Sequence, residues 1–183
     1  YRHRDFIINM NLLFFSFGFV LSLGELYLRF FYLHPSNVSF SSNSEGIRMP
    51  DNELHHTLQP NAQSVVTWGD LAPVYYTNSL GFRDKGRRTV QKTTESGYRI
   101  VVLGDSFTES LGVEWSDTFI FKLEQHFKND GFNSEILNGG VASLSPGLLL
   151  RKLRRFLHQG YTTDEVILML DISDIEDESV FYM

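Results

Sequence analysis

The stretch YRIVVLGDSFT, at residues 98–108, decides the fold because it joins an apolar run to a Gly-Asp-Ser turn. A continuous apolar run such as the one ending at Leu103 is typical of a strand buried on both faces. In open α/β sheets, ligands collect at the edge where the strands end. The sequence therefore predicts that the hydroxyl of Ser106 lies at that edge, as a candidate nucleophile.

Alternating helix and strand patterns follow this stretch. They predict a helix that starts at Ser116 or Asp117 and ends at Gly131, a strand at 134–137, a helix from Ser145 to Gly160 and a strand at 165–170. In the second helix, the apolar residues expected to face inward are Leu149, Leu153, Phe156 and Leu157, and the basic residues expected to face outward are Arg151, Lys152, Arg154 and Arg155. Together these elements predict an α/β fold, a three-layer α/β/α arrangement around a parallel sheet.

A second apolar run, at residues 6–24, carries no charge. As a helix it would be about 28 Å long, close to the thickness of the hydrocarbon core of a bilayer. Arg2 and Arg4 precede it, so the positive-inside bias places the N-terminus in the cytoplasm and the chain after about residue 34 outside. We expect a transmembrane anchor at residues 1–34. A cleaved signal peptide is the alternative, because Ser22-Leu23-Gly24 has small residues at a suitable spacing.

Composition divides the rest of the chain. Residues 35–50 are rich in Ser and Asn and are expected to form a linker; residues 51–96 are expected to form a small β and loop region, with strands at 64–68 and 73–77, a loop at 78–84 and an exposed stretch at 85–96; residues 97–183 carry the main domain. The net charge of -6 argues against a nucleic-acid partner, and the absence of cysteine excludes disulfides and thiolate metal sites.

Three predicted strand ends meet at one rim of the sheet, at residues 104–106, 138–140 and 171–174. Acyl transfer needs a nucleophile and hydrogen-bond donors aimed at the developing oxyanion. Ser106 can supply the hydroxyl and a backbone N–H, Gly140 a second N–H, and Ser173 a side-chain donor. The acidic residues near Ser173 could suggest a cation site, but the pattern favours a solvated acidic loop, so we expect no metal and no cofactor; they are Asp174, Glu176, Asp177 and Glu178.

This order of motifs resembles the SGNH (GDSL-type) hydrolase superfamily over roughly residues 75 to 183. Residues 98–108 look like the first conserved block of that family, and residues 137–141 look like its second. Residues 78–84 are similar to a segment that precedes the first block in membrane-anchored bacterial members. The resemblance implies a flavodoxin-like fold that is incomplete here, Ser106 as the nucleophile and Gly140 as the oxyanion glycine.

Two departures from the family pattern concern the chemistry. The third block normally reads Gly-x-Asn-Asp, but residues 171–174 read Asp-Ile-Ser-Asp, with Ser173 in place of the Asn donor. The final Asp-x-x-His block is missing, and a serine nucleophile without a base is poorly activated. Because the chain starts at Tyr1 and stops at Met183 just after a strand, we expect a C-terminally truncated fragment that is inactive by itself.

The resemblance implies a membrane-anchored bacterial serine esterase that hydrolyses ester bonds of acylated small molecules, glycans or lipids of the cell envelope. Its domain would lie on the periplasmic or extracellular side of a single membrane span. Two alternatives stay open. One is a polysaccharide O-acetyltransferase that uses the same serine, and the other is a non-catalytic glycan- or lipid-binding module on a degenerate SGNH scaffold.

Overall fold

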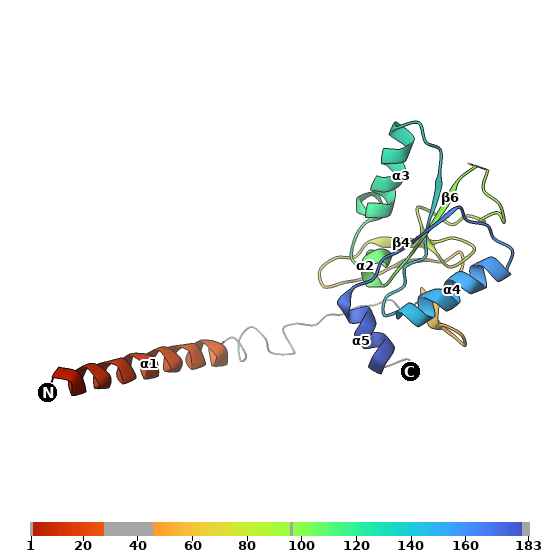
Figure 1. Ribbon diagram of the computed structural model, residues 1–183. Helices are drawn as coiled ribbons and strands as arrows, with labels where there is room; N and C mark the ends of the chain where they lie inside the picture. The colour runs from red at the N-terminus through yellow and green to blue at the C-terminus, as the bar shows by residue number, and fades with distance from the viewer. Residues whose placement is uncertain (1, 28–45, 96, 181–183) are drawn as a thin grey trace. The chain divides into compact units, whose positions relative to one another are not determined.

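The computed structural model describes residues 2–27, 46–95 and 97–180, which belong to two compact units divided between residues 40 and 41 (Figure 1). In the first unit, helix α1 covers Arg2–Tyr27. Its segment Ile8–Tyr27 has a mean hydropathy of 1.4 and none of it is buried, so it is long and apolar enough to cross a membrane. The predicted apolar helix is therefore confirmed in length and composition. A signal sequence meets the same criteria, so anchoring and orientation stay predictions.

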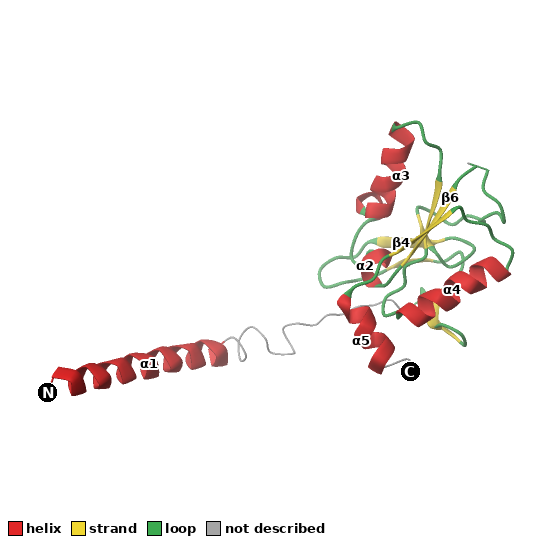
Figure 2. Cartoon of the chain, viewed as in Figure 1, coloured by secondary structure: helices red, strands yellow, loops and turns green. Residues whose placement is uncertain are grey.

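The second unit is built on a six-stranded sheet (Figure 2). In sheet order its strands are β3 (Gln63–Val65), β4 (Val74–Thr77), β5 (Arg83–Asp84), β7 (Glu135–Asn138), β6 (Arg99–Leu103) and β8 (Glu165–Leu168). β6 pairs in parallel with β7 and β8, whereas β3, β4 and β5 join antiparallel. The three strands predicted for the parallel sheet do pair in parallel, but the expectation of a purely parallel sheet is wrong, because three strands of the 51–96 region join the same sheet antiparallel. The connections between β3, β4 and β5 are too short for the crossover that a parallel pair requires.

Five α-helices and one 3₁₀ turn are present in the described residues. After α1 these are α2 (Ser106–Glu109), the 3₁₀ turn η2 (Trp115–Asp117), α3 (Phe119–Asn129), α4 (Pro146–His158) and α5 (Ile172–Val180). The predicted cap of α3 was Ser116 or Asp117, but these residues form η2 and the cap is Thr118, whose side chain accepts the Phe121 N–H at 3.2 Å. Helix α4 starts at Pro146 behind Ser145, as predicted.

A separate hairpin precedes the large sheet. β1 (Arg48–Asp51) pairs antiparallel with β2 (His55–Leu58), and Ile47 just before it is fully buried. The expected linker at 35–50 therefore gives way to ordered structure by Ile47, and its residues 35–45 lie outside the described residues. The expectation of an exposed stretch at 85–96 fails at Val90, which is 3 % exposed because it packs into the main core.

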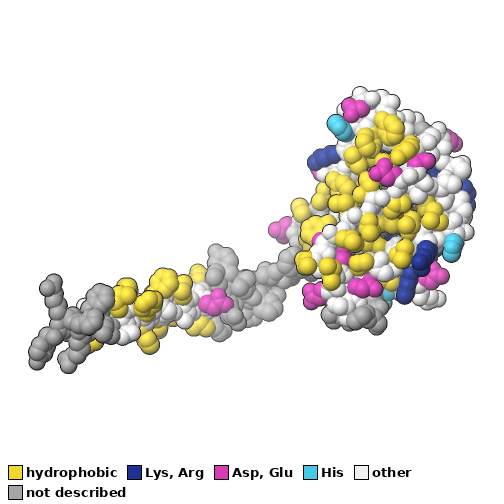
Figure 3. All heavy atoms as spheres, in the orientation of Figure 1, with side chains coloured by type: hydrophobic (Ala, Val, Ile, Leu, Met, Phe, Trp, Pro, Cys, Tyr) yellow, Lys and Arg dark blue, Asp and Glu magenta, His cyan; other side chains and the backbone are white. Residues whose placement is uncertain are grey.

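The core lies on both faces of β6 and β7, because successive residues of a strand point to opposite sides. Val101, Leu103 and Leu137 join the larger cluster, which includes the α4 residues Leu149 and Phe156. Ile100, Val102 and Ile136 join a smaller cluster with Ile120 of α3. The edge strand β8 is less covered, since Val166 and Leu168 are exposed. Figure 3 shows hydrophobic side chains gathered across one face of this unit.

Helix α4 departs from its predicted faces at two positions. Leu149 and Phe156 are buried as expected, but Leu157 is 45 % exposed. Lys152, expected to face solvent, is 4 % exposed. Residue 152 lies three positions after Leu149 and four before Phe156, so helical geometry places it on the buried face regardless of its charge.

Candidate active site

The turn after β6 is shaped by Gly104 and Asp105. A Cβ at Gly104 would overlap the hydroxyl of Thr108 and lie 2.9 Å from the Met169 carbonyl oxygen, so only glycine fits there. Asp105 caps α2, because its Oδ1 accepts the Phe107 N–H at 3.0 Å. The chain therefore turns sharply from strand to helix, and Ser106 stands at the first position of α2.

The Ser106 side chain is half-buried, and its hydroxyl donates to Asp105 Oδ2 at 3.3 Å. Ser106 lines two cavities. One of about 340 Å³ also touches Phe107 and Leu111, and one of about 360 Å³ also touches Arg48 and Ser143. Cavities of this size are typical of small-molecule sites. The predicted nucleophile therefore borders spaces that a substrate could enter.

Gly140 serves packing in this structure. A Cβ there would overlap the backbone nitrogen of Glu109 and lie 2.6 Å from the Thr108 carbonyl carbon. Its N–H donates to Asn138 Oδ1 at 3.0 Å, and Asn138 Nδ2 in turn donates to the Thr108 carbonyl at 2.9 Å. Gly140 lines neither Ser106 cavity. The oxyanion role predicted for Gly140 would require this internal bond to open.

A second serine, Ser143, lines the 360 Å³ cavity together with Ser106. Its φ of 60° is a left-handed conformation that L-residues seldom adopt outside Gly, Asn and Asp. The local sequence did not indicate Ser143, because the adjacent glycines at 139 and 140 are the stronger signal and nothing near a serine predicts a positive φ.

Ser173 is exposed and does not line either Ser106 cavity. Its hydroxyl and its N–H both donate to Asp171 Oδ1 at 2.6 Å. The residues after β8 that do lie near the Ser106 turn are two carboxylates, Asp171 and Asp174, which approach Asp105. Oxygens of Asp105, Asp171 and Asp174 all lie within 4.8 Å of one another.

Like charges and burial shift the titration of these carboxylates. Burial, followed by the nearby charge of Asp171, raises the pKa of Asp105. Burial also raises the pKa of Asp174, whereas hydrogen bonds from Ser173 lower the pKa of Asp171. Proton sharing within the cluster is one way to relieve the repulsion. Three carboxylates at this spacing could also ligate a cation, so the expectation of no metal stays a prediction.

A histidine also borders the 360 Å³ cavity, but its ring is engaged elsewhere. His56 Nε2 lies 2.7 Å from the Ala142 carbonyl, and its Nδ1 lies 2.9 Å from Nδ1 of His55. Burial lowers the pKa of His56, so the ring is neutral near pH 7. In the part of the chain that the structure describes, no histidine hydrogen-bonds to the Ser106 hydroxyl.

Two arginines support the site, the half-buried Arg48 and the buried Arg83, and neither role was predictable from the local sequence. Arg48 Nη2 lies 2.8 Å from both carboxylate oxygens of the fully buried Glu109, which also accepts the Ala142 N–H at 2.7 Å. This pair connects the hairpin to α2 and to the loop after β7. Arg83 donates to the carbonyls of Glu109 and Ser110 at 2.7 and 2.6 Å. Arg83 therefore fixes the end of α2, whose first residue is Ser106.

No family profile matches the sequence, and no curated protein matches it either. Among solved structures the chain is similar to AlinE4, described as an SGNH-hydrolase family esterase, and to a mutant of the same esterase. Both matches have 25 % identity and a TM-score of 0.39, and they cover 43 % of this chain and 42 % of the esterase chain. The chain thus spans less than half of the esterase that it matches, and the activity of that esterase is a statement about that protein alone.

Proposed function

We propose that this protein is a serine hydrolase of the SGNH type that cleaves ester bonds, with Ser106 as the nucleophile. The observation that carries the proposal is the position of Ser106, at a strand-to-helix turn and on the walls of two cavities. The order of the three motifs along the chain supports it independently.

In the proposed reaction, the Ser106 oxygen attacks the acyl carbon and the alcohol leaves, which gives an acyl-enzyme that water then hydrolyses. The hydroxyl proton must pass to a base, and its present acceptor is Asp105, whose raised pKa makes that carboxylate a better base than an ordinary aspartate. A neutral histidine is the more effective base in serine hydrolases, and the resemblance implies that the histidine of the family's final Asp-x-x-His block takes this role.

The negative charge that develops on the acyl oxygen needs donors nearby. We propose the backbone N–H groups of Ser106 and Ser143 for this role, because both residues border the same cavity. Gly140 and Ser173 are the weaker candidates, since neither lines a cavity that Ser106 borders. Loss of one such donor costs on the order of 10²–10³ in rate in a serine hydrolase.

A fluorophosphonate probe tests the nucleophile, because it phosphonylates an activated serine and leaves ordinary serines untouched. We expect a protein that also contains the histidine base implied by the resemblance to be labelled once, and its Ser106→Ala variant to remain unlabelled. Ser179→Ala, which removes an exposed hydroxyl on α5, is the matched control and should label like wild type. Labelling of Ser106→Ala at the wild-type level would refute the assignment.

The non-catalytic module remains the second candidate because two expected oxyanion donors are engaged within the protein. Gly140 donates to Asn138, and Ser173 donates to Asp171. Hydrolysis of p-nitrophenyl acetate by a protein that also contains the histidine base separates the two proposals, since a binding module gives no turnover above the Ser106→Ala background. Addition of a sugar acceptor to the same assay distinguishes hydrolysis from O-acetyl transfer. Acylated glycans or lipids of the cell envelope are the proposed substrates.

A further inference from the structure

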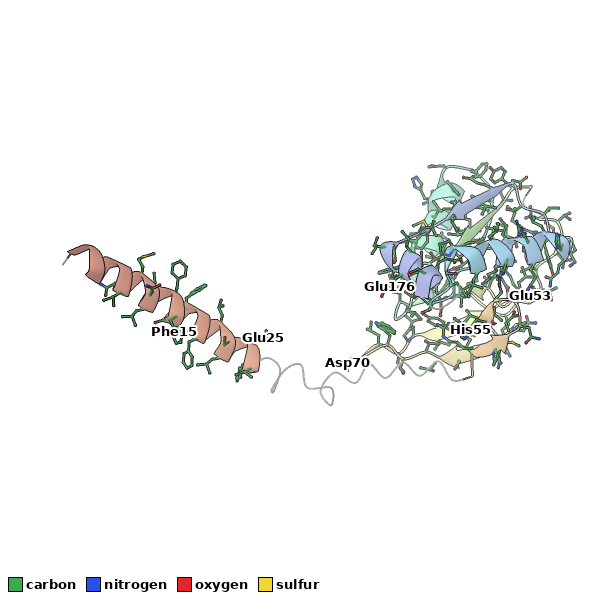
Figure 4. The ribbon with its side chains drawn as sticks, turned by 60° about the horizontal axis from the view of Figure 1, so that its bottom comes forward. Phe15, Glu25, Glu53, His55, Asp70 and Glu176 are labelled. Atoms are coloured by element: carbon green, nitrogen blue, oxygen red, sulfur yellow. The ribbon has the colours of Figure 1, made fainter. Side chains whose placement is uncertain are left out.

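A separate cavity of about 440 Å³ lies between α4, the β1–β2 hairpin and the segment before β5, and it shares no wall residue with the two Ser106 cavities. The hairpin and α4 are neighbours in the fold, and Figure 4 labels Glu53 and His55 on the hairpin side. Arg155 of α4 reaches across with two hydrogen bonds of 2.6 Å to Asp51. Apolar side chains form much of the wall of this cavity; they include Leu54, Leu58, Leu80, Phe82, Phe156 and Tyr161.

Lys152 is the unusual member of this wall. It is 4 % exposed, and its Nζ is buried with no hydrogen-bond partner in the described part of the chain. The Nζ lies 4.7 Å from the centre of the Phe82 ring, which borders the same cavity. A buried ammonium without a partner is strongly unfavourable. Either the Lys152 amine is therefore neutral, or a bound anion supplies the missing partner.

The other cations of the wall already have partners. Lys92 Nζ donates to the Gln159 carbonyl at 2.5 Å and lies over the Tyr161 ring, and Arg155 is paired with Asp51 and Glu53. Lys152 is therefore the cation that a ligand in this cavity would have to neutralise. Among the described residues of this wall, Lys152 is the cation without a hydrogen-bond or ion-pair partner, and a singly charged anion on an apolar body would supply one.

We propose that this cavity is a second ligand site that binds a small organic carboxylate, with its apolar part against Phe82 and Tyr161 and its carboxylate on Lys152. A carboxylate carries a single charge at neutral pH and accepts hydrogen bonds from an ammonium. A phosphate group carries nearly two charges there, for which the cavity offers no second unpaired cation in the described residues. The cavity volume is within the usual range for small-molecule sites.

Titration calorimetry on the full chain in detergent, with 3-phenylpropionate as the probe, tests this site. We expect saturable binding of 3-phenylpropionate by wild type, and none of its uncharged amide or of inorganic phosphate. Lys152→Met should abolish binding. Arg154→Met is the matched control, because it removes an exposed charge from the same helix outside this cavity, and it should bind like wild type.

The pH dependence provides a second readout in the unmodified protein. Burial lowers the pKa of Lys152 to about 7. The charged groups that face it are Glu109 of α2, Arg48 and Asp51 of β1, and Arg155 of α4. Because the carboxylate binds the ammonium form, we expect the dissociation constant to rise about tenfold from pH 6 to pH 8.

Three results would overturn the proposal. One is equal affinity of Lys152→Met and wild type for 3-phenylpropionate, and another is equal affinity of wild type for the acid and its amide. The third is an absence of saturable binding by wild type at pH 6. The test does not involve Ser106, so it stands or fails separately from the proposed hydrolase.

Discussion

At the residue scale, the ion pair between the half-buried Arg48 and the buried Glu109 holds the wall of the Ser106 cavity. Glu109 is fully buried and accepts from both Arg48 Nη2 and the Ala142 N–H. We expect Arg48→Met to lower the free energy of unfolding by about 3–5 kcal/mol, because it leaves a buried carboxylate without its counter-charge. Urea unfolding followed by circular dichroism measures the loss.

The control for Arg48→Met is the double variant Arg48→Met with Glu109→Leu. Replacement of a whole buried ion pair by apolar residues is often neutral or stabilising, so the double variant should recover most of the loss. A double variant as unstable as Arg48→Met would show that packing around the arginine stem, and not the unpaired carboxylate, sets the cost.

Lys152 predicts a pH dependence of stability with a definite sign. Its pKa falls from the ordinary 10.5 to about 7 on folding, so between these pH values the unfolded chain binds one more proton than the folded chain. The free energy of unfolding should therefore rise with pH in this window, by about 1.4 kcal/mol per pH unit from this residue. Below the folded pKa the destabilisation by Lys152 is complete and no longer changes with pH, because the amine is charged in both the folded and the unfolded chain.

The comparison between wild type and Lys152→Met isolates this effect, since all other titrating groups are common to both. We expect the difference in unfolding free energy between them to shrink as pH rises from 7 to 10. A difference that stays constant with pH would mean that Lys152 has an ordinary pKa in the folded protein.

At the scale of elements, Arg155 fastens the β1–β2 hairpin to α4. It makes two hydrogen bonds of 2.6 Å to Asp51 and one of 2.8 Å to Glu53, and the hydrogen bond from Arg155 holds the pKa of Asp51 well below its usual range. We expect Arg155→Ala to speed amide hydrogen exchange in the hairpin by about tenfold or more, since charge-assisted bonds of this kind contribute about 1.5–3 kcal/mol.

Arg154→Ala is the matched control for the hairpin, because residue 154 is exposed on the same helix. It should leave the exchange rates unchanged. At acidic pH the wild type should approach the variant, since protonation of Asp51 removes the charge that Arg155 binds. Equal exchange in Arg155→Ala and wild type at pH 7 would contradict the fastening role.

Local sequence patterns predicted some elements well, but they failed where the structure depends on contacts between segments that are far apart in sequence. The apolar run before Gly104 and the Ser-Pro start at 145–146 gave β6 and α4 close to their observed bounds. The pairing of β5 with β7 was not predictable, because it joins residues far apart in sequence through a single register pair. The burial of Lys152 was missed for a different reason, since its charge was weighted above its helical position.

One part of the candidate site was predictable from local sequence, and another part depends on distant segments. Ser106 and its turn follow from the eleven consecutive residues 98–108, and the structure places this serine beside cavities. The cavity wall comes from Arg48, His56 and Trp68, which precede Ser106 by at least 38 positions. No local pattern connects such segments, so the residues that shape a substrate pocket were beyond the sequence analysis.

At the scale of the whole molecule, α1 determines whether the chain resides in a membrane. Its segment Ile8–Tyr27 has one charged residue, Glu25, near its end. Arginine near the middle of a membrane helix costs about 2.5–3.5 kcal/mol per residue. We therefore expect the double variant Phe17→Arg with Leu21→Arg to shift the chain from the carbonate-resistant membrane fraction to the soluble fraction, whereas Phe17→Leu with Leu21→Phe should stay with the membrane.

The intact mass of the membrane-bound chain distinguishes an anchor from a signal peptide. An anchor keeps α1 and gives the full mass, whereas cleavage after the small residues at 22–24 would remove most of α1.

The orientation of the chain in the membrane can be tested on the same preparation. Arg2 and Arg4 predict a cytoplasmic N-terminus, so protease added outside spheroplasts should digest the unit that carries Ser106. Protection of that unit until the membrane is broken would reverse the proposed topology and exclude substrates that are confined to the envelope.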